Sequence, residues 1–192
     1  MKKLLITGFD PFGDNAINPS WEAVKALPEQ IGKYELCKLN IPTVYGKAAE
    51  MVVSVAEELG AHVVICVGLA GGRDAVTPER IAVNIRDAKI PDNAGVLHGG
   101  EPVAEDGPAA SFATLPVARM AQAIRNANIP AAVSNTAGTY VCNDVLYTLL
   151  HHFRDTNVRA GFIHVPRLPE QGTPNLPLKT TVKALVTAIE AI

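Results

Sequence analysis

Cys142 lies in a stretch of small and polar residues, 134–144, whose composition suits a reactive thiol. The stretch follows the short apolar run 131–133, which predicts a buried strand, and it precedes a segment with helical periodicity that starts at Val141. Gly138 favours a tight turn between the two. Cys142 is therefore expected in or beside the first helical turn, where free N–H groups and the helix dipole favour the thiolate. Simple packing is the alternative, since most free cysteines are inert core residues.

A thiol nucleophile needs a base for its proton and a third group that orients the base. His164 ends an apolar segment that predicts a buried strand, so it is either the base or a hydrogen-bonded core histidine. The third group could be Glu79, Asp10 or Asp144. Glu79 is the best placed, because it directly precedes another predicted strand and would lie at the edge of the sheet. The backbone N–H of Cys142 would supply one oxyanion donor.

The elements that must position these residues follow from hydrophobic periodicity. Strands are predicted at 3–8, 34–41, 63–67, 81–85, 131–133 and 160–165, and helices at 19–27, 44–59, 115–127, from 141 and at 177–192. This order predicts an α/β fold, a single-domain α/β/α sandwich over residues 1–192 with a mostly parallel twisted sheet of the phosphorylase/hydrolase kind. Loops 8–13 and 68–73, the Cys142 turn and His164 would then meet at the carboxyl edge of the sheet.

Three loops stand out between these elements. Phe9 and Phe12 flank an Asp-Pro pair in a glycine-bounded loop, so they either fold back onto the core or line a pocket. The glycine-rich loop 68–73 lacks both the dinucleotide fingerprint and the P-loop lysine. The long loop 93–110 is rich in Gly, Pro and charge, which suggests that it gates or borders the active site.

Composition argues against several classes of protein. The formal net charge is -2, with 17 basic and 19 acidic residues, so we expect no nucleic-acid or membrane partner. The N-terminal apolar run is too short for a signal peptide, and no stretch approaches the length of a membrane span. The 3 cysteines do not form a disulfide framework. A cytoplasmic protein is therefore expected.

Seven segments of the chain together resemble the pyroglutamyl peptidase I (pyrrolidone-carboxylate peptidase) family. They are 8–13 (Gly-Phe-Asp-Pro-Phe-Gly), 18–20 (Asn-Pro-Ser), 68–73, 79–84 (Glu-Arg-Ile-Ala-Val-Asn), 90–93 (Ile-Pro-Asp-Asn), 134–143 and 161–166. The resemblance covers almost the whole chain in the family's order, and the cysteine-bearing motif is highly specific.

This resemblance implies a cysteine peptidase that removes an N-terminal pyroglutamate (5-oxoproline) from peptides through an acyl-enzyme. Cys142 would be the nucleophile, His164 the base and then the acid, and Glu79 the residue that orients His164. Phe9 and Phe12 would form an apolar slot for the lactam ring, which suits a flat neutral ring. The further substrate-binding positions that the resemblance implies are Asn18, Leu69, Lys89 and Val141. It also implies a homotetramer that needs no cofactor or metal.

Two positions depart from the family's usual residues. Leu69 stands where the family often has Gln, and Lys89 stands where it often has Arg. A contact from that Gln to the substrate would be missing here. A lysine would supply charge at the second position, but not the planar fork of an arginine.

Three other functions are compatible with parts of the sequence. Phosphate-dependent glycosyl transfer would use 71–73 as an anion site, but it leaves Cys142 unexplained. A non-catalytic binding module would use the same pocket with an unreactive Cys142. A zinc site built from Cys142, His151, His152 and His164 is the weakest alternative, because the spacing matches no usual ligand pattern.

Overall fold

The computed structural model describes residues 1–13 and 15–192 and is built around one six-stranded sheet. The strands follow the spatial order β2-β3-β1-β4-β10-β5. Their bounds are β1 Lys2–Phe9, β2 Gln30–Ile31, β3 Tyr34–Ile41, β4 Val63–Leu69, β5 Thr77–Pro78 and β10 Arg159–Val165. β3, β1, β4 and β10 are parallel, and the short strands β2 and β5 run antiparallel at the two edges. The prediction of a mostly parallel sheet is confirmed.

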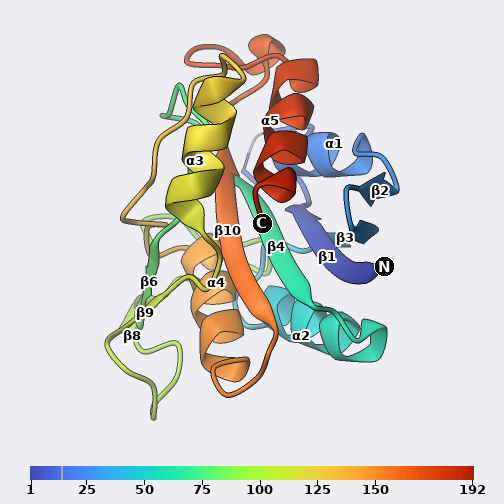
Figure 1. The fold of residues 1–192 in the computed structure, drawn as a ribbon. Coiled ribbons are helices and arrows are strands. Elements are labelled where there is room, and N and C mark those ends of the chain that lie inside the picture. Colours follow the sequence, from blue (N-terminus) through green and yellow to red (C-terminus); the bar gives the residue numbers. More distant parts are fainter. Residues whose placement is uncertain (14) are drawn as a thin grey trace.

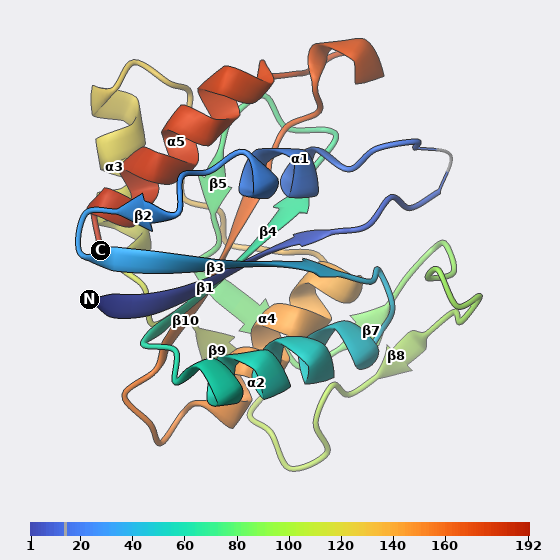
Figure 2. The same ribbon diagram turned by 90° about the vertical axis from the view of Figure 1, so that its right-hand side faces the viewer.

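Helices cover both faces of this sheet (Figures 1 and 2). Their bounds are α1 Pro19–Lys25, α2 Lys47–Leu59, α3 Val117–Asn126, α4 Val141–His152 and α5 Leu178–Glu190, with a short 3-10 helix at Pro169–Gln171. α1, α3 and α5 pack on one face and share a core with Ile6, Ile65 and Ile163. α2 and α4 pack on the other face against Leu5 and Phe162. The predicted α/β/α sandwich is therefore confirmed.

Local sequence explains why these elements begin and end where they do. β4 is buried along Val63–Val67 because helices cover both of its faces, as its unbroken apolar run predicted. Asn18 caps α1 by accepting a hydrogen bond from Ser20 N, with Pro19 at the first turn. α2 ends at Gly60, whose φ of 63° is left-handed.

The prediction of a buried strand at 131–133 is wrong. The segment is extended but mostly half-exposed, and it touches its neighbour through two isolated parallel bridges, Val76 to Ala131 and Glu79 to Ser134. Three small apolar residues were mistaken for a core strand because a short apolar run carries no periodicity of its own.

The remaining strands form two small antiparallel ladders beside the main sheet. They are β6 Ile81–Val83 with β9 Ala110–Phe112, and β7 Arg86–Asp87 with β8 Gly99–Glu101. The long loop 93–110 thus contains regular structure at its middle and its end. Within the described ranges 1–13 and 15–192, no helix is long and apolar enough to cross a membrane.

Candidate active site

Cys142 is the second residue of α4 and is mostly buried, with a small part of its surface facing the pocket. The helix begins where the sequence predicted, after a turn in which Gly138 has a φ of 76°. The sulfur lies close to β4 because Gly68 has no side chain. A Cβ at Gly68 would come within 3.0 Å of Cys142 Sγ and 2.7 Å of the Phe162 ring. The sheet thus makes room for the thiol at its carboxyl edge.

His164 and Glu79 are joined by a hydrogen bond at the same edge. β10 brings His164 opposite Thr77 of β5, and Glu79 follows β5 directly. The distance from His164 Nδ1 to Glu79 Oε1 is 2.7 Å, and both side chains are buried. The carboxylate therefore fixes the ring with Nε2 as its remaining nitrogen. The Phe162 ring packs against the imidazole, with the two centroids 4.7 Å apart, and further restricts the orientation of the His164 ring.

Arg73 is a member of the same cluster that the sequence analysis did not identify. Its Nη1 lies 2.6 Å from Glu79 Oε1, and Nη1 also donates to Thr77 Oγ1. Its Nη2 donates to the carbonyl of Thr136 at 2.8 Å, in the turn that leads to Cys142. The Gly-rich loop had suggested an anion site, but this arginine is already bound to a carboxylate of the protein.

Burial decides the protonation states at this edge. Burial raises the pKa of the Cys142 thiol to about 12, and the nearby charge of Glu79 adds to this. Burial also lowers the pKa of His164, although its bond to Glu79 acts the other way. Burial alone would raise the pKa of Glu79, but the contacts with His164 and Arg73 bring it below its usual value. The resting site thus holds a thiol, a neutral imidazole and a carboxylate.

This result corrects one expectation from the sequence. The start of a helix was expected to favour the thiolate of Cys142. Its own backbone N–H does lower the pKa, but burial and the charge of Glu79 outweigh it. The thiol therefore depends on a base for its activation.

A pocket of about 310 Å³ opens beside Cys142 and His164. It is lined by Phe9, Phe12, Asn18, Thr43, Leu69, Ala70, Arg73, Thr136, Ala137, Gly138, Tyr140, Cys142 and His164. Phe9 is the last residue of β1 and Phe12 lies in the loop that follows it, and both line this pocket, Phe9 while also packing in the core. A volume of this size suits a small ring with walls that are mainly apolar.

Asp10 fixes the segment that joins Phe9 to Phe12. Its Oδ1 accepts hydrogen bonds from the backbone N–H and the hydroxyl of Thr43, each at 2.7 Å. Asn93 reaches the same oxygen at 3.2 Å and the carbonyl of Pro11 at 2.9 Å. Asp10, one of the three carboxylates considered for orienting His164, thus orders a pocket loop.

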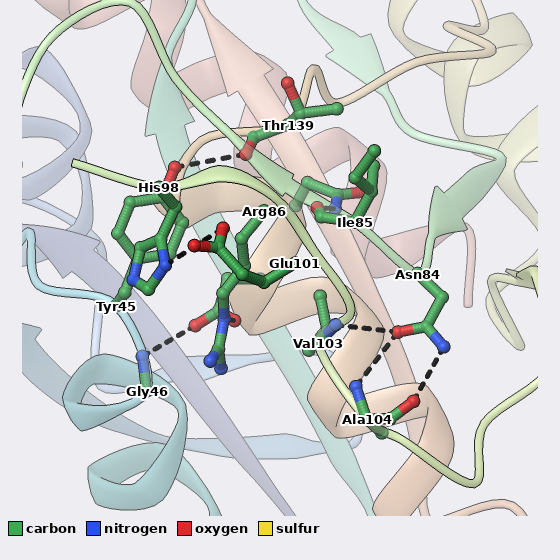
Figure 3. A network of polar contacts seen from close by, with 12 residues as sticks. Tyr45, Gly46, Asn84, Ile85, Arg86, His98, Glu101, Val103, Ala104 and Thr139 are labelled. Atoms are coloured by element: carbon green, nitrogen blue, oxygen red, sulfur yellow. Dashed lines mark hydrogen bonds and ion pairs between the residues drawn. The ribbon is translucent and has the colours of Figure 1, made fainter.

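Asp144, the third carboxylate considered, is also engaged elsewhere. It is fully buried in the first turn of α4, where it lies 2.6 Å from Arg86 Nε and accepts the N–H of Gly46 at 2.8 Å. Arg86 and Gly46 lie close together (Figure 3). Of the three carboxylates, Glu79 is the one that contacts His164.

The structure separates the other predicted substrate-binding residues into two groups. Asn18 and Leu69 line the pocket. Lys89 is exposed and Val141 is fully buried in the core of the sheet face that α4 covers, and neither is among the described residues that line the pocket. The sequence could not separate these groups, because the direction of each side chain depends on the turns around it.

Loop 93–110 does not contribute a lining residue to the pocket within the described part of the chain. Asn84 anchors its middle by accepting hydrogen bonds from the N–H groups of Val103 and Ala104, at 2.8 and 2.9 Å (Figure 3). Tyr147 of α4 donates to the Pro108 carbonyl at 2.6 Å. The loop contacts the residues around the pocket through Asn93, whose backbone N–H donates to the carbonyl of the lining residue Thr43 at 3.0 Å and whose side chain bonds to Asp10 and Pro11.

Two of the three histidines of the suggested zinc site, His151 and His152, do not line the pocket. His152 lies 2.9 Å from Glu57, and His151 lies 3.5 Å from Asp106. No group of three His, Cys, Asp or Glu side chains suited to a metal ion occurs in residues 1–13 and 15–192.

A thiol, an imidazole and a buried carboxylate beside one pocket, at the carboxyl edge of a parallel α/β sheet, are the groups of a cysteine hydrolase. The family model described as pyroglutamyl peptidase matches residues 2–192. The chain therefore belongs to the pyroglutamyl peptidase family, a family of cysteine peptidases whose function is the removal of N-terminal pyroglutamate.

Named relatives and solved structures agree with this assignment. The pyrrolidone-carboxylate peptidase of Lactobacillus johnsonii is 52% identical over 198 residues, which covers 99% of this chain and 92% of the relative. Pyroglutamyl peptidase I from Bacillus amyloliquefaciens has a TM-score of 0.96 at 43% identity, covering 100% of this chain and 96% of that chain. Pyrrolidone carboxyl peptidase from Thermococcus litoralis has a TM-score of 0.95 at 40% identity, covering 100% and 93%.

Proposed function

We propose that this protein hydrolyses the bond between an N-terminal pyroglutamate and the next residue of a peptide, with Cys142 as nucleophile, His164 as base and then acid, and Glu79 as the residue that orients His164. The observation that carries the proposal is the meeting of these three side chains beside a small, largely apolar pocket. Phe9 and Phe12 would flank the lactam ring there.

The reaction follows from the resting protonation states. Cys142 Sγ attacks the pyroglutamyl carbonyl carbon while its proton passes to His164 Nε2. The tetrahedral oxyanion lies at the start of α4, where the N–H of Cys142 can donate to it. The C–N bond then breaks, and the leaving amine takes the proton from His164. This leaves a thioester between Cys142 and the pyroglutamyl group.

Water completes the cycle. His164 removes a proton from a water molecule that attacks the thioester, and the thiolate of Cys142 leaves and takes that proton back. Free pyroglutamate is the product. Glu79 stabilises the imidazolium that forms in each half of the cycle through its bond to Nδ1.

The decisive test is hydrolysis of a chromogenic pyroglutamyl amide, with prolyl and glutamyl amides as controls. We expect turnover of the pyroglutamyl compound alone, and its loss together with one covalent adduct at Cys142 after treatment with a pyroglutamyl chloromethyl ketone. Cys142→Ala should be inactive, whereas Cys37→Ala, the same change at the partly buried cysteine of β3, should keep full activity. Turnover by Cys142→Ala would refute the mechanism.

We also infer a cytoplasmic homotetramer that works without a cofactor, as the family resemblance implies. Exposed apolar side chains support an association surface: Ile90, Leu97 and Phe112 are 50%, 58% and 68% exposed. Light scattering should give four times the mass of the chain, and a monomer peak at micromolar concentration would contradict this. Activity should persist in a chelator.

A further inference from the structure

We propose that Arg73 is a positioning residue of the active site, which holds the Glu79 carboxylate in the orientation that receives the His164 ring. The proposal rests on the proposed function for its catalytic meaning. Its geometric basis is that Glu79 Oε1 is shared by two donors, Arg73 Nη1 at 2.6 Å and His164 Nδ1 at 2.7 Å.

The other oxygen of Glu79 gives the carboxylate no second anchor. Oε2 is buried and has no hydrogen-bond partner among the described side chains and backbone. The Ser134 hydroxyl, which contributes to lowering the pKa of Glu79, donates to the Thr136 carbonyl at 3.0 Å and leaves Oε2 unbonded. Without Arg73, the carboxylate would keep its bond to the imidazole, the group that it is meant to orient, and its weaker contact with Ser134.

Arg73 also connects this carboxylate to the turn before the nucleophile. Its planar fork spans Glu79 and Thr77 through Nη1 and the Thr136 carbonyl through Nη2. The loop that follows β4, the residues that follow β5 and the turn before α4 are thereby joined by one side chain. A lysine at this position would keep the charge but could not make both sets of contacts.

The charge of Arg73 acts on the proton that moves during catalysis. The charged or titratable groups that face the His164–Glu79 pair are Arg73 from the β4–β5 loop, Cys142 from α4 and, through Cys142, Cys66 of β4. Burial lowers the pKa of His164, Glu79 raises it, and the charge of Arg73 lowers it further by a smaller amount. Removal of Arg73 should therefore let the pair bind a proton at a higher pH, whichever of the two residues carries it.

The experiment compares Arg73→Met and Arg73→Lys with Arg86→Met, a matched control at the arginine that pairs with the other fully buried carboxylate. One readout is the pH profile of kcat/KM on the pyroglutamyl amide. The other is an NMR titration of the His164 ring in a Cys142→Ala background, which needs no activity. If the wild type shows no turnover, the proposed function fails, while the NMR titration still decides the role of Arg73.

For Arg73→Met we expect the pKa of the pair to rise by about one unit and kcat to fall by about 10- to 100-fold. Arg73→Lys should titrate near the wild type but lose several-fold in kcat. Arg86→Met should lower Tm without moving the titration. An unshifted His164 titration in folded Arg73→Met, or a loss of Tm alone as in Arg86→Met, would overturn the proposal.

Discussion

Glu79 and Asp144 are both fully buried, and each lies 2.6 Å from an arginine that is itself partly exposed. Their other partners differ. Glu79 shares one oxygen between Arg73 and the imidazole of His164, whereas Asp144 uses one oxygen for Arg86 and the other for the backbone N–H of Gly46. The active-site carboxylate thus contacts a group that can gain and lose a proton. The hydrogen-bond partners of Asp144 in the described part of the chain, Arg86 and the backbone N–H of Gly46, do not change their charge.

This difference distinguishes a carboxylate that orients a catalytic base, Glu79, from one that stabilises the fold, Asp144. The Arg73–Glu79 pair contacts the turn before α4 through the Thr136 carbonyl, whereas Asp144 lies in the first turn of α4 and accepts a hydrogen bond from the Tyr45–Gly46 turn. A buried carboxylate with an arginine is therefore not by itself a sign of an active site. The titrating partner and the pocket beside it make Glu79 the functional one.

The largest expected effect comes from Glu79→Gln. A neutral amide cannot stabilise the imidazolium of His164, so kcat/KM should fall by about 10³- to 10⁴-fold. Steady-state kinetics on the pyroglutamyl amide measure this, with circular dichroism to establish folding. A folded variant that retains a tenth or more of wild-type activity would show that Glu79, like Asp144, has a structural and not a catalytic role.

Asp144→Asn should reverse the pattern and affect stability more than catalysis. It leaves Arg86 without its carboxylate, so the free energy of unfolding should fall by about 2–3 kcal/mol, allowing for the partial exposure of the arginine. Urea unfolding measures this change. The kcat of the folded variant should stay within tenfold of the wild type, and a thousandfold loss without destabilisation would erase the distinction between the two carboxylates.

The pH profile should distinguish the two carboxylates by the direction of its shift. The pKa of His164 is lowered by burial from its usual 6.5, so the neutral base persists below that pH and the acid limb of kcat/KM should lie below pH 6.5. Because Glu79 raises this pKa, Glu79→Gln should move the limb to still lower pH. Asp144→Asn should leave it unmoved. A limb that shifts upward in Glu79→Gln would contradict the assigned charges.

The smallest expected effect is at Leu69, which lines the pocket but touches neither carboxylate–arginine pair. Leu69→Gln would add an amide that can bond the lactam, so KM should fall about fivefold while kcat and the pH profile stay unchanged, as one net hydrogen bond of about 1 kcal/mol predicts. Initial-rate kinetics decide this. A higher KM would mean that the apolar wall contributes more to binding than the new bond.

The sequence alone predicted the four parallel strands of the sheet, its layers and the meeting of Cys142, His164 and Glu79, because these depend on periodicity and on where strands end. It missed the edge strands β2 and β5, and the strand expected at 81–85 lies in a separate ladder. It could not predict the partner of Arg73, since an arginine in a glycine-rich loop fits an anion site equally well until the fold brings Glu79 within reach. The sequence also could not show that the side chains of Lys89 and Val141 lie away from the pocket wall. The resemblance specified their positions in the chain, but not the directions of their side chains.

The same limit explains the error at 131–133. Its pairing with Val76 and Glu79 is a tertiary contact made at two points. No local pattern in three small residues distinguishes such a contact from a strand.

Cys142 rests as a thiol, because burial, to which the negative charge of Glu79 adds, raises its pKa to about 12. Peroxide and general alkylating agents react with thiolates, so this cysteine should oxidise slowly while it waits for substrate. A nucleophile formed only during proton transfer to His164 is protected in the idle enzyme. We therefore expect activity to survive mild oxidants that inactivate enzymes with a preformed thiolate.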